Sequence, residues 1–311
     1  MRFGLKGILA VGLLASVAGS AACAQQQGVL DPKPPPPLAN PSDPSLPARD
    51  LFGRATGPAS LAARSIGWYA KGCLAGAQAL PVDGEAWQVM RLSRNRNWGH
   101  PALISLLEGF AKRVPSVSGW RGLLVGDISQ PRGGPMFGGG HASHQIGLDA
   151  DIWLTPMPDH TLSAPDRETM SAVNMVREDW LDIDPRTYGP GQMAVVKAAA
   201  QERQVERIFV NPAIKKAMCR DAGDDRAWLH KVRPMFGHNY HFHVRIACPP
   251  GETVCTEQDP IPPGEGCDAS LDHWFSDAVL HPKPASIRKK PRPPMTLAQL
   301  PAACRQVLVA K

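Results

Sequence analysis

Hydrophobic and polar positions along this chain repeat with two different periods, which predicts a mixture of helices and strands. Apolar residues recur at helical spacing in HPALISLLEGFAK (100–112) and in QMAVVKAAAQER (192–203). In residues 211–223 Asn211 is a candidate N-cap, Pro212 suits a first turn and Gly223 suits a helix end. Two segments are typical of strands: RGLLVGDIS (121–129) and ERIFVN (206–211). This order predicts an α+β fold, an antiparallel sheet with flanking helices and long loops.

Two further segments alternate strictly between apolar and polar residues, which is typical of strands with one buried face. In LDADIWL (148–154), Asp149 and Asp151 share one face and the apolar residues share the other. In HFHVRIA (241–247), the apolar positions are expected to face the core, and the opposite face carries His241, His243 and Arg245. If both strands belong to one sheet, a pair of carboxylates and a pair of imidazoles converge.

The beginning of the chain predicts a secretory signal peptide over residues 1–24. Arg2 and Lys6 form a short basic region, residues 7–19 are apolar and uncharged, and small residues around Cys23 suit cleavage. Cleavage near Ala24 is favoured over lipid attachment at Cys23, because Ser20 stands where a lipoprotein signal prefers leucine. No later stretch approaches the roughly 18 uncharged apolar residues that a membrane span needs. We therefore expect a protein of the periplasm.

Proline-rich segments flank a central domain. Residues 25–50 predict an extended linker, residues 51–280 have a globular composition, and residues 281–311 form a basic, proline-rich C-terminal tail. The chain has a net charge of +6, of which the tail carries +7 and residues 1–24 carry +2, so residues 25–280 have a net charge of −3. Because the basic character belongs to the tail, we expect no nucleic-acid-binding face.

Six of the seven cysteines follow the predicted signal peptide, and an even number in an exported chain favours disulfides. A zinc cluster of cysteines is disfavoured because no CxxC pair occurs. Six cysteines allow about 15 pairings, and spacing alone does not choose among them. Cys304 lies beyond the second proline-rich stretch, where a bond to Cys73 would pin the tail onto the domain.

Histidines cluster in two windows, HASH (141–144) and HFH (241–243), with His238 just before the second. Imidazole and carboxylate are the ligands of a catalytic zinc site, which uses three protein ligands and keeps one open position. A single histidine on a strand is more often a hydrogen-bonded bystander, but this clustering favours a metal site. The glycines at 138–140 do not suit a phosphate loop because no lysine follows them, and Ser143 lacks the GxSxG motif.

At these residues the chain resembles the penicillin-insensitive murein endopeptidases, periplasmic members of the LAS group of zinc peptidases. That group has an H-x6-D element, which His144 and Asp151 match, and a later H-x-H element, which residues 241–243 match. Further segments are similar to the family: SIGWYAKGCLAGAQALP (65–81), QVMRLSRNRNWGHP (88–101), RIFVNPAIKKAMC (207–219) and WLHKVRPMFGHNYHFHVRIACP (228–249). The resemblance covers roughly residues 60–275 and Cys304, and it implies a LAS-type metallopeptidase domain stapled by disulfides.

The resemblance also implies roles for individual residues. His144, Asp151 and His243 match the zinc ligands, His141 is a further ligand or a partner of one, and Asp149 is expected to orient a ligand. His241 matches the catalytic base or transition-state stabiliser, with His238 beside it. Where the family has an Asp-x-x-His pair linked to an additional metal, this chain has Asp179 and Asp182, so Asp179 is the candidate ligand of a second zinc. The implied disulfides are Cys73–Cys304, Cys219–Cys267 and Cys248–Cys255.

The implied activity is that of a zinc-dependent DD-endopeptidase, which hydrolyses the D-alanyl-meso-diaminopimelyl cross-links of peptidoglycan by attack of a zinc-bound water. A zinc DD-carboxypeptidase or amidase on the same polymer is the alternative, because the ligand set does not distinguish these cleavages. A third hypothesis is a non-catalytic wall-binding protein with a structural zinc. His241 argues against it, because a structural site has no use for an imidazole beside its ligands.

Overall fold

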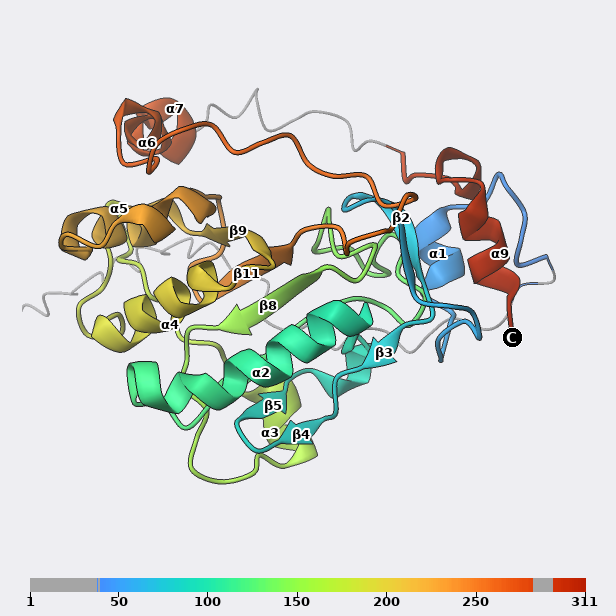
Figure 1. Ribbon diagram of the computed structural model, residues 1–311, viewed down its shortest axis with the longest axis horizontal. Coiled ribbons are helices and arrows are strands. Elements are labelled where there is room, and N and C mark those ends of the chain that lie inside the picture. The colour runs from blue at the N-terminus through green and yellow to red at the C-terminus, as the bar shows by residue number, and fades with distance from the viewer. Residues whose placement is uncertain (1–37, 39, 282–292) are drawn as a thin grey trace, which may run out of the picture.

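The structure is a computed structural model that describes residues 38, 40–281 and 293–311 (Figure 1). The predicted signal peptide (1–24) and the first part of the predicted linker lie outside the described residues. A seven-stranded sheet with the strand order β10-β9-β11-β8-β7-β5-β4 runs through the molecule. In chain order its strands are β4 (Asp83–Gly84), β5 (Trp87–Val89), β7 (Leu123–Val125), β8 (Asp149–Trp153), β9 (Val205–Val210), β10 (Val232–Pro234) and β11 (His241–Ile246).

The sheet is antiparallel at its centre, one parallel pair follows on each side, and the pair β5–β4 at one edge is antiparallel again. β9, β11, β8 and β7 are joined by antiparallel pairs, as predicted. The pairs β10–β9 and β7–β5 are parallel, so the sheet as a whole is mixed. A helix lies between the two strands of each parallel pair along the chain and returns it to the end of the sheet where the first strand began, as a parallel pair requires. The predicted α+β class is confirmed.

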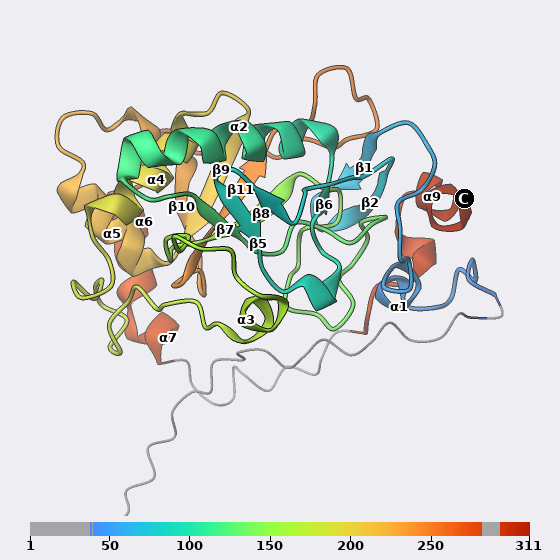
Figure 2. The same cartoon turned by 90° about the horizontal axis from the view of Figure 1, so that it is seen from below.

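Helices lie on both sides of this sheet. α2 (Pro101–Ser118) and α4 (Pro190–Gln201) run together along one face, and α3 (Ala164–Thr169) lies on the other side (Figure 2). Further helices are α1 (Ala48–Phe52), α5 (Pro212–Asp221), α6 (Ala269–Asp272), α7 (Asp277–Leu280) and α9 (Ala303–Val309), with short 3-10 turns η1 (Leu92–Arg94), η2 (Ala227–Lys231), η3 (His273–Phe275) and η4 (Leu297–Gln299). Within the described residues, no helix combines the length and the apolar character that crossing a membrane requires.

Local sequence explains where the helices begin and end. Asn211 caps α5, because its Oδ1 accepts a hydrogen bond from Ala213 N at 2.9 Å. α2 begins at Pro101 as expected, but it runs to Ser118, beyond the predicted end at residue 112. The extension follows from Val114, which continues the buried stripe of the helix, and Gly119 ends it with a φ of +75°.

The main hydrophobic core lies between the sheet and the pair α2 and α4. On one face of β8 and β11 the residues are apolar, belong to this core and are at most 1% exposed: Ala150, Ile152, Phe242, Val244 and Ile246. The predicted faces of these two strands are therefore confirmed. Their polar residues point to the face of the sheet that α2 and α4 do not cover.

A smaller core joins the two ends of the described chain. It lies between α1, the hairpin of β1 (Arg64–Trp68) and β2 (Lys71–Ala75), and the C-terminal elements η4 and α9. Its members include Leu51, Phe52, Ile66, Leu297, Leu300 and Val307. The disulfide Cys73–Cys304 crosses this cluster. The other two disulfides join Cys219 to Cys267 and Cys248 to Cys255, so all three implied pairings are confirmed. A short pair, β3 (Gln78–Ala79) with β6 (Trp98–Gly99), connects this region to α2.

Candidate metal centre

The loop before β8 places His144 beside that strand. His144 has a left-handed backbone (φ 65°), which costs energy for a residue other than glycine and is found most often at functional sites. Its backbone N–H donates to Asp149 Oδ2 at 3.0 Å. Gly147, at φ +71°, completes the turn, and a Cβ there would lie 2.5 Å from Leu74 Cδ2 and 2.8 Å from His100 N. Only glycine fits this position without displacing the loop.

Antiparallel pairing of β8 with β11 brings carboxylates and imidazoles to the same patch of the sheet. The register places His243 opposite Asp151 and Arg245 opposite Asp149. Directly opposed residues project to the same face, so both pairs lie together on the face away from α2 and α4. The condition for convergence stated in the sequence analysis, that both strands belong to one sheet, is therefore met, and the strands are direct neighbours in it.

Three acceptor atoms converge at the centre of this patch. His144 Nε2 is 3.2 Å from His243 Nδ1 and 3.4 Å from Asp151 Oδ1, and His243 Nδ1 is 3.2 Å from the same oxygen. The other nitrogen of each ring donates elsewhere, His144 Nδ1 to the carbonyl of Ile128 at 2.6 Å and His243 Nε2 to Asp149 Oδ1 at 2.7 Å. Both rings therefore turn a lone pair toward Asp151 Oδ1, a buried oxygen that has no hydrogen-bond partner among the described residues.

His141 adds a further nitrogen at the edge of the cluster. Its Nε2 lies 3.0 Å from Asp127 Oδ2, which turns Nδ1 toward Asp151 Oδ2 at 3.7 Å. One ligand atom each from His141, His144 and Asp151 lie within 4.8 Å of one another. Burial opposes the charge of Asp127, but the contacts with His141 and with Arg96 (2.8 Å) hold the pKa of this carboxyl below its ordinary range.

Asp149 supports His243 from behind the cluster. It accepts hydrogen bonds from His243 Nε2 at 2.7 Å and from Arg245 Nε at 2.6 Å. The guanidinium of Arg245 lies 4.2 Å from the ring centre of Tyr69 and 5.2 Å from that of Phe209. Burial alone would raise the pKa of Asp149, but Arg245 and His243 lower it below its ordinary range. Asp149 is therefore a carboxylate at neutral pH, and it fixes the ring of His243.

The convergent donor set fits a divalent metal ion such as zinc. Two imidazole nitrogens and one carboxylate oxygen are the ligands that catalytic zinc sites use. Lone pairs at these distances repel one another unless a cation lies between them. Burial lowers the pKa of His243, but Asp149 and Asp151 outweigh it and raise the pKa. The buried, partnerless oxygen of Asp151 is the observation that supports the fit.

Two more imidazoles flank the cluster. His241 Nε2 is 3.6 Å from Asp151 Oδ1, and His241 Nδ1 is buried without a hydrogen-bond partner among the described residues. His238 has a left-handed backbone (φ 52°), and its ring centre lies 4.9 Å from that of His241. Burial is the main cause that lowers the pKa of His241 to about 4 and that of His238 to about 3. Both rings are therefore neutral near pH 7 and can accept a proton.

Asp179 lies on an exposed loop, where its carboxylate has partners from the chain itself. It pairs with Arg177 at 2.8 Å and accepts from the backbone N–H of Leu181 at 3.0 Å. Asp182 pairs with Arg220 at 3.1 Å. A second metal at Asp179 stays a prediction.

Sequence patterns missed the residues that support the cluster: Arg94, Arg96, Asp127, Tyr69 and Phe209. Asp127 carried a signal, because it interrupts the apolar run of the predicted strand 121–129. Tyr69 and Phe209 carried none, since their contact with Arg245 depends on how distant strands are arranged.

Comparisons with known proteins agree with this geometry. The sequence profile of a family described as penicillin-insensitive murein endopeptidase matches residues 65–309. A protein of that name from Haemophilus influenzae is 45% identical over 250 residues, which cover 79% of this chain and 82% of the relative. Proteins of the same name from Klebsiella pneumoniae and Escherichia coli are each 42% identical, and the matches cover 81% of this chain and 89% of each relative. The chain therefore belongs to the family of penicillin-insensitive murein endopeptidases.

Proposed function

We propose that this protein is a zinc-dependent endopeptidase that hydrolyses the peptide cross-links of peptidoglycan in the periplasm. The observation that carries the proposal is the buried convergence of His144 Nε2, His243 Nδ1 and Asp151 Oδ1, all within 3.4 Å of one another. Membership of a murein endopeptidase family supports a hydrolase that acts on peptidoglycan. The predicted signal peptide supports the location.

His144, Asp151 and His243 are the residues that would hold the ion, with His141 as a fourth ligand or as a partner of Asp151. When bound, zinc supplies a Lewis acid that polarises the scissile carbonyl and lowers the pKa of a water molecule. Asp149 keeps Nδ1 of His243 directed at the cluster, because it holds the proton on Nε2.

His241 is the residue to which we assign proton transfer. Its ring borders the cluster, 3.6 Å from Asp151, and its Nδ1 makes no hydrogen bond to another described residue. A neutral imidazole in this position accepts the proton of the attacking water and returns it to the leaving amine. His238 Nδ1 donates to the carbonyl of Phe236 at 3.0 Å, which leaves its Nε2 as a second acceptor beside His241.

The bond that we assign is the amide between D-alanine and meso-diaminopimelate in the cross-link. In this scheme the nucleophile is water, so the enzyme has no serine for a β-lactam to acylate. A water nucleophile therefore agrees with the insensitivity to penicillin after which the family is named.

Purified protein and cross-linked muropeptide dimers test the proposal. With zinc present we expect dimers to become monomers, and with a chelator we expect no reaction. Surviving dimers in the presence of zinc would refute endopeptidase activity. Monomers that shorten by one alanine would indicate a carboxypeptidase, and stem peptides freed from the glycan would indicate an amidase.

Two histidine variants separate ligand from base. His243→Ala should lose bound zinc, whereas His241→Ala should keep its zinc and lose turnover. Loss of zinc from His241→Ala would make His241 a ligand. The same metal analysis counts the ions per chain. Two ions in the wild-type protein and one in Asp179→Ala would support the second site. One ion in both proteins would contradict it.

A further inference from the structure

A row of side chains crosses the sheet from the metal cluster to the outermost strand, β10. Asp151 of β8 lies opposite His243 of β11, and His243 lies opposite Phe209 of β9. Phe209 in turn lies opposite Arg233 of β10. Paired residues project to the same face, so all four side chains share the face that carries the cluster. Neighbouring strands are about 4.8 Å apart, so the Cα of Arg233 lies about 10 Å from that of His243.

Phe209 separates the cluster from Arg233. Its ring centre lies 5.3 Å from that of His243 and 6.4 Å from that of His238. Both Phe209 and Arg233 are partly exposed. The row therefore presents, in order, a metal site, an aromatic ring and a cation.

The guanidinium of Arg233 is held in place without an ionic partner. It forms no hydrogen bond and no ion pair with another described residue. Gly266 lies against it, since a Cβ there would be 2.8 Å from Arg233 Nη1. Burial and the neighbouring Arg207 lower the pKa of Arg233, but a guanidinium remains a cation at neutral pH. An anion that binds here would offset both effects.

The neighbours of Arg233 have other contacts. Arg207 Nη2 donates to the carbonyl of Asp259. Asp268 is the acid close enough to raise the pKa of Arg233, but its Oδ1 caps α6 by accepting from Ser270 N at 2.9 Å. The donors of Arg233 are therefore left for a group from outside the described chain.

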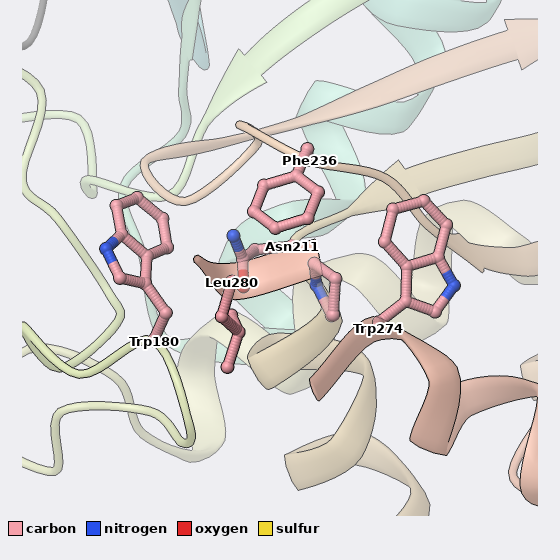
Figure 3. Close-up of a pocket in the computed structure, with 6 residues that line it drawn as sticks. Trp180, Asn211, Phe236, Trp274 and Leu280 are labelled. Carbon is pink, nitrogen blue, oxygen red and sulfur yellow. The ribbon is translucent and has the colours of Figure 1, made fainter. Parts of the chain in front are cut away.

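The aromatic side chains beyond the end of β10 already pack within the fold. Phe236 lies between Trp180 and Trp274 in Figure 3, and its ring centre is 5.8 Å from that of Trp274. Trp180 packs against the main core. A charged substrate group near β10 therefore finds its partner in Arg233 rather than in this aromatic cluster.

The distance along the row selects among the charges of a cross-link. The stem peptide that supplies the D-alanine carries two carboxylates, one on its D-glutamate and one at the free end of its diaminopimelate. Each lies about three residue lengths from the scissile carbonyl, or about 10 Å at 3.3–3.6 Å per residue. The carboxylate beside the scissile nitrogen is about one residue length away, which is too near for Arg233.

We infer that Arg233 binds a free carboxylate of the stem peptide that supplies the D-alanine, an inference that rests on the proposed function. The guanidinium would hold this carboxylate in a two-point contact. The stem would lie over the ring of Phe209, with its scissile carbonyl at the cluster. Arg233 would thus make the enzyme selective for stems that carry this negative charge.

Steady-state kinetics on three synthetic dimers test this inference. The first dimer carries both carboxylates, the second has the D-glutamate carboxylate converted to an amide, and the third has the free diaminopimelate carboxylate converted to an amide. With the wild-type enzyme we expect KM to rise about tenfold for one of the two amidated dimers, which identifies the carboxylate that is bound. The value of kcat should change by less than about twofold, because this contact lies away from the reacting atoms.

Arg233→Met should raise KM for the first dimer about tenfold and give the same KM for all three dimers. Arg233→Lys keeps the charge but not the two-point contact, and it should give an intermediate KM even if the methionine variant does not fold. Arg186→Met is the control, since this side chain is 86% exposed, and it should keep the wild-type KM values. Bound zinc should be unchanged in every variant.

Equal KM values of the wild-type enzyme for all three dimers would overturn the inference. A wild-type ratio between the dimers in Arg233→Met or Arg233→Lys would also overturn it, because another residue would then hold the carboxylate. If the wild-type enzyme cleaves none of the dimers, the proposed function fails instead. The Kd values of the intact dimers then decide the inference by the same comparisons.

Discussion

Asp149→Asn tests whether the carboxylate behind the cluster determines metal binding. Asp149 is fully buried and accepts hydrogen bonds from His243 and from Arg245, whose side chain is only 6% exposed. An amide keeps the shape, but its NH₂ group can turn toward His243 and disfavour the ring orientation that presents Nδ1. The substitution thus removes the charge and preserves the volume.

Two magnitudes follow from these contacts. Changing a residue that orients a metal-ligating histidine lowers metal affinity about 10–100-fold. Removing one partner of a buried ion pair costs about 3–5 kcal/mol, and Arg245 has too little solvent contact to recover that loss by hydration. We expect both effects in Asp149→Asn, because the same carboxylate serves both neighbours.

Competition with a chelating indicator measures the zinc affinity, and urea unfolding of the metal-free protein measures the stability. Asp182→Asn is the control, since its partner Arg220 is 48% exposed and such a pair contributes about 1 kcal/mol or less. The double variant Asp149→Asn with Arg245→Met should recover part of the stability but none of the zinc affinity. A zinc affinity of Asp149→Asn within twofold of the wild type would refute the orienting role.

Three further substitutions test the loop, the disulfide and a buried lysine. Gly147→Ala should lower the free energy of unfolding in urea by more than about 1–3 kcal/mol, because the added Cβ would lie 2.5 Å from Leu74. Gly139 is the control, since its φ of +80° is similar but no atom would lie within 4 Å of an added Cβ, so Gly139→Ala should show the conformational cost alone. Equal losses in the two variants would contradict the role of crowding at Gly147. Cys304→Ser removes a disulfide between residues that are 231 positions apart and should lower the free energy of unfolding by about 2–5 kcal/mol. We expect a lower Tm for this variant under oxidising conditions. An unchanged Tm would show that the small core is stable without the disulfide. Lys215 donates to the carbonyls of Leu229 and Glu265, and burial is the main cause that lowers its pKa from 10.5 to about 7. Between these two values the unfolded chain binds more protons than the folded one, so stability should rise as the pH rises from about 7 to 10.5, and Lys215→Met should flatten this part of the profile; a wild-type slope in that variant would contradict the assignment.

The predictable part of this site depended on a local rule. Side chains alternate across a strand wherever it lies, so the polar faces of β8 and β11 could be assigned before their partners were known. The spacing of His144 and Asp151 is also local, because one turn connects them. The sequence made the convergence conditional on the two strands sharing a sheet, and the structure supplied both the pairing and the register with His243 opposite Asp151.

The remainder depended on contacts between distant segments. Nothing in the local sequence places the rings of Tyr69 and Phe209 beside Arg245, or Arg96 beside Asp127, because these contacts join separate strands and loops. The two parallel pairs of the sheet were missed for a related reason: a parallel pair depends on the helix that connects its two strands. Composition also described residues 281–311 only as a proline-rich tail, whereas Leu297, Leu300 and Val307 fill a core with α1.

That smaller core has a consequence for the order of biosynthesis. Cys73 leaves the ribosome 231 residues before Cys304, and Phe52 and Leu51 leave earlier still. These N-terminal apolar residues lack the part of their covering surface that η4 and α9 supply until the end of the chain has been synthesised, so this region is completed last although its first strands are made first. A chain that stops before Leu297 would expose the apolar side of α1 and a free thiol at Cys73, the two features by which quality-control proteases and thiol oxidoreductases recognise unfinished proteins.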